Sequence, residues 1–310
     1  MKKIILNKYT LPLNAGRYLW LLVFLCLFLN NAQSQNATPA SASTSEAVKP
    51  IKNTFDDIIL IDNQTVEANQ KNMFEFVLEH RFGAPISTGY SDMFGLFTSA
   101  NMALKVYYSP LNNLNLGVGI NEENKTWEGN LKWAIMRQSE TGGWPVSISY
   151  FGNFAIDGRP TAGNFVNSSD RFSYFNQLMI ARKFSDFWSI QAGVSMSYFN
   201  NIPGYLDSLG NVQPKMNNAH YAMEFLGRFK LTETTSIVVD YDQPLTTHPM
   251  DNPKCNIAAG FDFEIKGHSF ELFLTNYGYT LPQDNNFYNQ NDYKKGNWVF
   301  GFNITRKWQF

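Results

Sequence analysis

Residues 298–310 read WVFGFNITRKWQF, and bulky apolar side chains recur at every second position of this stretch. Successive side chains of a β-strand point to opposite faces, so the stretch predicts a strand with one apolar and one polar face. The apolar face holds Trp298, Phe300, Phe302, Ile304, Trp308 and Phe310, with Arg306 as an interruption. The polar face holds Asn297, Asn303, Thr305, Lys307 and Gln309.

The last residues of this strand also predict how the chain is assembled. They resemble the C-terminal signal that the outer-membrane assembly machinery reads: a polar residue, a small residue, and two aromatic residues two positions apart. We assign these roles to Asn303, Thr305 (where glycine is usual), Trp308 and Phe310. The alternative is an ordinary aromatic-rich strand. The expected partners are therefore the assembly machinery and outer-membrane lipid.

The same alternation recurs from about residue 72 onward, and no segment sustains the i, i+3, i+4, i+7 spacing of an amphipathic helix. In 114–121, for example, leucine, valine and isoleucine alternate with asparagine and glycine. The expected strands, about twelve in number, are 72–82, 101–108, 114–121, 127–135, 144–156, 172–184, 187–199, 219–230, 235–243, 254–266, 268–276 and 297–310.

The connections between these strands alternate between short and long. Long ones, rich in Asn, Asp, Gly and Pro, fall at about 83–99, 157–171, 199–218 and 277–296, whereas Ser185-Asp186 is one of the short ones. Short turns at one end and long loops at the other are typical of membrane barrels. We therefore predict an all-β fold, a closed antiparallel up-and-down transmembrane β-barrel with long external loops. A soluble all-β domain is the alternative.

The composition agrees with membrane strands. Charged residues make up 16% of the chain, against about 25% in a soluble domain, and aromatic residues make up 15%. After the first 34 residues no apolar run approaches the length of a membrane-spanning helix, which is about 20 residues. Alternation dilutes the apolar residues of a membrane strand, so its signal is weaker than that of a helix.

The N-terminal region predicts export. Basic residues precede an apolar run from Leu19 to Leu29, which is followed by the small residues of Ala32-Gln33-Ser34. This order is typical of a signal peptide cleaved after Ser34, with an uncleaved anchor as the alternative. We expect a signal peptide at 1–34, a flexible linker at 35–54, a short pre-barrel segment at 55–71 and the barrel at 72–310, located in the bacterial outer membrane. Whether 55–71 plugs the barrel or lies in the periplasm stays open.

Charge and cysteine content limit the partners. Removal of 1–34 leaves 21 basic and 26 acidic residues, a net charge of −5, which argues against nucleic acid as a partner. Cys255 is then the single cysteine, so no internal disulfide is expected.

No catalytic or cofactor motif stands out. The four histidines show no HxH or HExxH spacing, and there is no CxxC pair, so no metal or other cofactor is expected. An outer-membrane phospholipase is the enzyme alternative, which needs His and Ser on one face. His268 and Ser269 are adjacent and point to opposite faces, so within one strand they cannot form this pair. A serine on a neighbouring strand is the alternative partner. We expect no enzyme activity.

The inward face of the predicted strands carries charges of both signs. The candidate lumen-facing residues are Glu75, Glu79, Arg81, Lys105, Glu128, Lys132, Glu224, Arg228, Asp240, Asp262, Glu264 and Glu271. Opposite charges that pair across a narrow interior would give a structural or binding barrel of unknown ligand. The alternative is a small-solute channel with a weak cation preference.

Several short segments resemble one family. They are Gln64-Thr65-Val66-Glu67, Glu79-His80-Arg81-Phe82-Gly83, QLMIARKF at 177–184, Gly267-His268 with Leu272 and Thr275-Asn276, and Phe300-Gly301-Phe302-Asn303-Ile304. In this order they resemble the membrane-bound β-barrel domain family called domain of unknown function 5777, over about 55–310. Ser269 and Glu271 depart from the pattern. The resemblance implies the fold and the membrane location, and it implies no catalytic or ligand-binding residue.

Overall fold

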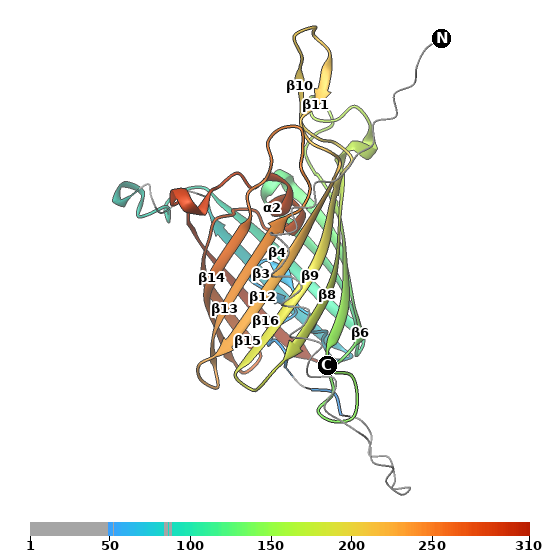
Figure 1. The fold of residues 1–310 in the computed structure, drawn as a ribbon, viewed down its shortest axis with the longest axis vertical. Coiled ribbons are helices and arrows are strands. Elements are labelled where there is room, and N and C mark those ends of the chain that lie inside the picture. Colours follow the sequence, from blue (N-terminus) through green and yellow to red (C-terminus); the bar gives the residue numbers. More distant parts are fainter. Residues whose placement is uncertain (1–48, 52, 84–85, 87–88) are drawn as a thin grey trace, which may run out of the picture. The chain divides into compact units, whose positions relative to one another are not determined.

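The computed structural model describes residues 49–51, 53–83, 86 and 89–310. The predicted signal peptide and most of the predicted linker lie outside the described residues. Within the described part, twelve strands close into one antiparallel barrel, as predicted (Figure 1). They are β3 (Met73–Phe82), β4 (Ala100–Leu111), β5 (Leu114–Asn121), β6 (Thr126–Met136), β7 (Ser147–Ile156), β8 (Phe172–Lys183), β9 (Trp188–Phe199), β12 (Ala219–Lys230), β13 (Thr235–Pro244), β14 (Asn256–Ile265), β15 (His268–Thr275) and β16 (Val299–Gln309).

The barrel closes where the last strand meets the first. β16 pairs antiparallel with β3, and Gln309 lies opposite Met73. Both barrel termini therefore lie at the end that also holds the short turns 112–113, 184–187, 231–234 and 266–267, which we call the turn end. The opposite end, called the loop end, holds 83, 86, 89–99, 157–171, 200–218, 245–255 and 276–298.

The strand bounds differ from the predicted ones by a few residues, and one difference has a clear cause. β7 begins at Ser147 and not at residue 144. Pro145 has no N–H to donate to a neighbouring strand, so the ladder starts after it. The loop between β9 and β12 contains a hairpin, β10 (Gly204–Leu206) and β11 (Val212–Pro214), which stands beyond the barrel (Figure 1).

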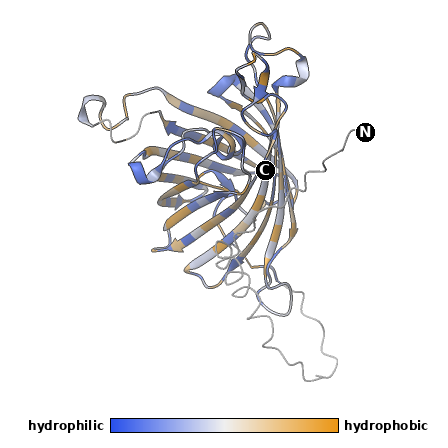
Figure 2. Ribbon diagram, turned by 45° about the horizontal axis from the view of Figure 1, so that its top comes forward, coloured by the Kyte–Doolittle hydropathy of each residue, from blue (hydrophilic) through white to orange (hydrophobic). Residues whose placement is uncertain are grey.

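The two faces of the barrel wall differ as the alternation predicts. Outward side chains such as Val118 and Trp127 are 65% and 63% exposed. Inward side chains of the same two strands, such as Asn115 of β5 and Glu128 of β6, are buried. Hydrophobic and hydrophilic residues alternate along the strands (Figure 2). An apolar belt that faces outward suits lipid, and the closed ladder leaves no unpaired strand edge.

No helix in the described residues is both long and apolar enough to cross a membrane.

Two segments fill the inside of the barrel. From the turn end, residues 53–71 enter as a turn-end plug that contains the small hairpin β1 (Ile59–Leu60) and β2 (Asn63–Gln64). From the loop end, the connection 276–298 dips inward and forms α2 (Pro282–Tyr288), visible in the barrel mouth in Figure 1. An apolar core forms between plug and wall. Its members are Phe55, Leu60, Ile61, Val66, Phe151, Phe175, Met179, Ala181, Leu226, Val238, Ala258, Phe273 and Tyr277.

Candidate functional site

The base of the turn-end plug is held by basic side chains of the wall. Arg228 forms an ion pair with Asp56, and the Lys307 Nζ lies 2.5 Å from the Asp57 Oδ1. Burial dominates the environment of Asp56 and raises its pKa, although the Arg228 charge opposes that effect. The ion pairs therefore compensate charges that have lost their water.

The tip of the plug is fixed through Ile61. Its φ of 58° is in the left-handed region, which is unfavourable for a β-branched residue. The Ile61 carbonyl accepts hydrogen bonds from Arg81 Nη2 (2.9 Å) and Asn303 Nδ2 (2.7 Å). The Ile61 N–H donates to the Glu271 carboxylate at 3.1 Å. Such backbone strain persists only where several contacts hold it, and here three wall side chains do so.

Amide side chains provide several of the other contacts of the plug. Gln191 donates to the Gln64 carbonyl (2.7 Å) and accepts from the Val66 N–H (2.8 Å). Asn63 Nδ2 donates to Asp240 (2.9 Å) and to Asp242 (2.7 Å). Gln191 therefore satisfies backbone groups of the plug as a neighbouring strand would.

The loop-end insertion is bound in the same way. Lys105 Nζ donates to the Thr280 carbonyl at 3.0 Å, and Gln283 Nε2 donates to Asn153 Oδ1 at 2.7 Å. The two insertions also meet, because Asn285 Nδ2 donates to Asp62 Oδ2 at 2.9 Å. Burial raises the pKa of Asp62, and Arg81 and the Asn285 amide oppose that shift. The lumen thus contains one continuous polar network that runs from the plug to α2.

The structure shows where the predicted lumen residues lie. Glu75, Glu79, Arg81, Lys105, Glu128, Lys132, Glu224, Arg228, Asp240, Asp262 and Glu271 are buried, and Glu264 is half-buried. They do not simply pair with one another. Lys105 contacts Glu79 (2.8 Å) and Glu128 (3.6 Å), as expected of opposite charges. Glu224, Asp240 and Glu271 instead accept hydrogen bonds from the amides of Gln177, Asn63 and Asn303. The contact with Asn63 could not be predicted, because the sequence did not place the plug inside the barrel.

The four residues of the predicted assembly signal fall on two faces of β16. Asn303 and Thr305 are buried inside the barrel. Trp308 and Phe310 are exposed, and the Phe310 ring lies 5.4 Å from that of Phe74. Asn303 therefore also anchors the plug, a contact that the sequence did not indicate.

One histidine does face a serine on a neighbouring strand. His220 of β12 lies opposite Ser197 of β9, and both are fully buried. His248 Nδ1 accepts the Asn217 N–H (2.9 Å), so neutral His248 carries its proton on Nε2, which faces His220 Nδ1 at 2.9 Å. Neutral His220 then carries its own proton on Nε2. Because Nδ1 of His220 accepts from His248 and its Nε2 already carries a proton, neutral His220 does not act as the base for Ser197. No hydrogen bond joins His220 to Ser197.

Among the residues that the structure describes, no group of three or more His, Cys, Asp or Glu side chains is arranged to hold a metal ion.

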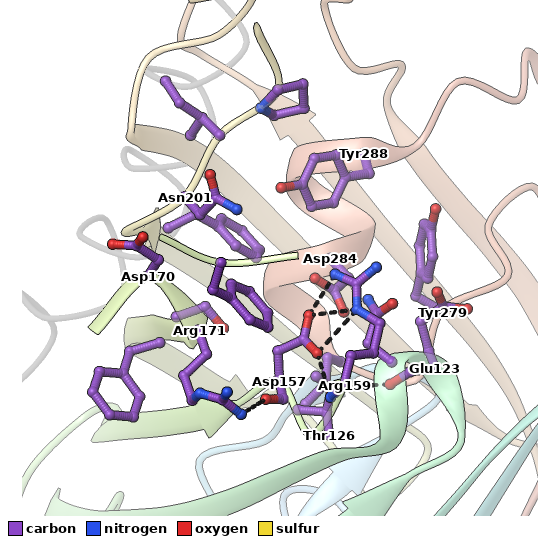
Figure 3. A pocket seen from close by; sticks show the side chains of 18 residues that line it. Glu123, Thr126, Asp157, Arg159, Asp170, Arg171, Asn201, Tyr279, Asp284 and Tyr288 are labelled. Carbon is purple, nitrogen blue, oxygen red and sulfur yellow. Dashed lines mark hydrogen bonds and ion pairs between the residues drawn. The ribbon is translucent and has the colours of Figure 1, made fainter. Parts of the chain in front are cut away.

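A cavity of about 420 Å³ lies at the loop end, beside α2, and we call it the mouth pocket (Figure 3). Its walls come from the β5–β6 and β7–β8 connections, the start of the β9–β12 connection, and the loop-end insertion. Arg159 donates hydrogen bonds to both carboxylate oxygens of Asp157. Arg171 donates to the Asp157 carbonyl and to Thr161 Oγ1, and its guanidinium lies 4.9 Å from the centre of the Phe165 ring.

Asp284 of α2 lies at the bottom of the mouth pocket. It is 7% exposed, and its carboxylate has no hydrogen-bond partner among the described residues. Burial, reinforced by Glu123 and Asp157, raises the pKa of Asp284 to about 8. The sequence did not indicate this residue, because α2 is short and polar, although Pro282 in its first turn is a common helix-start signal.

A closed antiparallel barrel with an apolar outer face and a polar interior defines a membrane β-barrel. More particularly, the chain belongs to the membrane bound beta barrel domain family called domain of unknown function 5777, whose model matches residues 55–308. The matched region includes the turn-end plug from residue 55 onward. The predicted family is thereby confirmed. No curated protein matches the chain.

Several solved structures resemble the chain at low sequence identity. An outer membrane channel from Pseudomonas putida F1 has 10% identity and a TM-score of 0.50, covering 80% of this chain and 100% of its own. The NanC porin has 8% identity and a TM-score of 0.46, with 76% and 100% covered. The KdgM porin has 8% identity and a TM-score of 0.42, with 77% and 99% covered. At these identities the likeness concerns the fold alone.

Proposed function

We propose that this protein is an outer-membrane barrel whose lumen is closed and whose role lies in binding at the loop end. The contact between Asn285 and Asp62 is the observation that carries the proposal, because it joins the two insertions across the lumen. In this proposal the protein reaches the membrane after cleavage behind Ser34, is inserted by the assembly machinery, and has no enzymatic activity.

Electrical recording in planar bilayers tests whether the lumen is closed. Three variants are compared with the purified wild-type barrel: one without residues 54–69, one with 279–290 replaced by a short Gly/Ser linker, and one with both changes. A fourth variant, with the β10–β11 hairpin at 204–214 shortened, controls for loss of loop residues outside the lumen. Each is first checked for slower migration on a gel after boiling, which reports a folded barrel.

We expect the wild type and the hairpin control to be silent and the doubly shortened barrel to conduct steadily. A barrel of twelve strands is wider than the eight-stranded type that side chains alone can fill, so removal of both insertions should open a water path. Steady wild-type openings would contradict the proposal. Silence of the doubly shortened barrel would show that these insertions are not what closes the lumen.

The second candidate is a small-solute channel with a weak cation preference, gated by movement of the plug. It is favoured by cavities at both ends, the mouth pocket and one of about 710 Å³ at the turn end that is partly lined by the plug itself. The buried acids of the wall would supply the cation preference. Openings of the wild type that favour K⁺ over Cl⁻ would support this candidate over the closed barrel.

A further inference from the structure

We propose that the mouth pocket is a binding site for an organic cation that carries an ammonium group on an apolar body. The inference rests on the proposed function, since it names the class of ligand that the loop end would bind. It is carried by the shape of the pocket, its aromatic walls and the distribution of its charges.

Aromatic rings form much of the pocket wall. They come from the β7–β8 connection, the loop-end insertion and the loop-end residues of β8 and β9: Phe165, Phe172, Phe199, Tyr279 and Tyr288. The centres of the Phe199 and Tyr288 rings lie 5.1 Å apart, with an angle of 64° between the ring planes. In Figure 3 Tyr288 lies above Asp284, and Tyr279 lies to its side. Aromatic faces attract cations as well as apolar groups, so a ligand with both parts fits this wall.

The positive charges of the pocket already have partners. Arg159 is bound to the Asp157 carboxylate, and Arg171 is bound to the Asp157 carbonyl and to Thr161. The Asp170 carboxylate caps the N–H groups of Val166 and Asn167. An anionic ligand would therefore have to displace an existing contact.

Two carboxylates of the pocket are left without a hydrogen-bond partner in the described part of the chain. They are Glu123, which is half-buried near the rim, and Asp284, which is more than nine-tenths buried at the bottom. The pocket thus has acceptors for the N–H groups of a cation. Hydrogen bonds between an ammonium and a carboxylate are about twice as strong as neutral ones.

The charges around Asp284 should couple binding of the cation to release of the Asp284 proton. It faces Glu123 and Asp157 from the neighbouring connections, Asp62 from the plug and Glu128 from β6, and burial is the largest cause of its raised pKa. Arg159 is nearby but is bound to Asp157. Tyr279 and Tyr288 are neutral near pH 7, since the ordinary pKa of tyrosine is 10 and burial raises it further. With a pKa of about 8, Asp284 is largely protonated at pH 7. A bound ammonium group favours the carboxylate, so binding should release a proton.

Titration calorimetry with 2-phenylethylammonium tests this inference on the folded barrel in detergent at pH 7. Measurements in phosphate and in Tris buffer, which differ in ionisation enthalpy, report the protons released on binding. Uncharged 2-phenylethanol tests the need for the positive charge. The variants are Asp284→Asn, Tyr288→Leu and, as a matched control, Asp251→Asn. Asp251 pairs with Lys215 at the loop end but outside the pocket, so its substitution makes the same carboxyl-to-amide change away from the site.

We expect the wild type and Asp251→Asn to bind the amine with proton release and to bind the alcohol at least tenfold more weakly. Asp284→Asn should lose about tenfold or more in affinity and all of the proton release. Tyr288→Leu should weaken binding and leave the proton release per bound amine unchanged. Equal affinity of the wild type and Asp284→Asn, equal binding of amine and alcohol, or binding of neither would overturn the inference. None of these results affects the recording of conductance, which tests the closed lumen separately.

Discussion

Lys105 is the residue whose loss should most disturb the filled lumen. Its ammonium group is buried, lies 2.8 Å from Glu79 and 3.6 Å from Glu128, and donates to the Thr280 carbonyl. Lys105→Met keeps most of the side-chain volume and removes the charge. Removal of one partner from a buried ion pair typically costs about 3–5 kcal/mol, because the remaining charge is left without compensation. We expect a loss of that size in the free energy of unfolding.

The loss of the Lys105 charge should destabilise the Glu79 carboxylate more than the Glu128 carboxylate. Glu128 still accepts a hydrogen bond from Asn153 at 2.6 Å, whereas Lys105 is the charged partner of Glu79. Glu79→Gln in the Lys105→Met background should therefore recover part of the stability, and a further Glu128→Gln should add little.

Urea unfolding followed by tryptophan fluorescence, with the barrel in detergent, measures these differences. The control is Lys125→Met, which removes an exposed lysine from the β5–β6 connection. Unfolding of Lys105→Met at the wild-type urea concentration would refute the reasoning. So would a Glu79→Gln substitution that destabilises the Lys105→Met barrel further.

Three further predictions concern the pocket, the lipid face and assembly. Asp284 has a pKa of about 8 when folded against an ordinary value of 3.8, so its contribution to stability is present below about pH 4 and is lost as the pH rises through 8. Asp284→Asn should therefore flatten the decline in unfolding free energy between pH 5 and 9, and an unchanged pH profile would contradict this. Val118→Lys should cost about 2–4 kcal/mol on the lipid face, whereas Val166→Lys, on a loop residue that is 91% exposed, should be nearly neutral in the same urea assay. Deletion of Phe310 or Phe310→Asp should lower the amount of heat-modifiable barrel in outer-membrane fractions, with Leu209→Asp at the exposed hairpin tip as control, and normal amounts would show that the terminal aromatic is not an assembly signal.

The barrel wall could be predicted because its signal is local. A period of two fixes which side chains share a face, and a shift by one residue would turn Val118 and its neighbours inward. For this reason the strands and their number follow from the sequence, and the predicted inward charges are found buried or half-buried.

The contents of the lumen could not be predicted, because they depend on contacts between distant residues. Asp62 and Asn285 are 223 positions apart. The buried side chains of α2 are largely polar, so the segment has no apolar stripe that would mark it as an inserted helix. From the sequence alone, substitution of inward Asn115 or Asn256 by Lys or Arg is expected to have a mild effect on stability. The structure changes that expectation, since both are buried and both hydrogen-bond to an inserted segment.

The polar character of this network bears on whether the lumen can open. Plug and α2 are held largely through amide, carboxylate and carbonyl groups, and each such hydrogen bond contributes only about 1 kcal/mol net when water can replace it. While the lumen is dry, the same groups would be left unsatisfied if one insertion moved alone, at about 1–3 kcal/mol each. Movement of the plug therefore requires entry of water or simultaneous movement of α2. Because the mouth pocket borders α2, a ligand bound there against Asp284 would act on a helix that contacts the plug through Asn285.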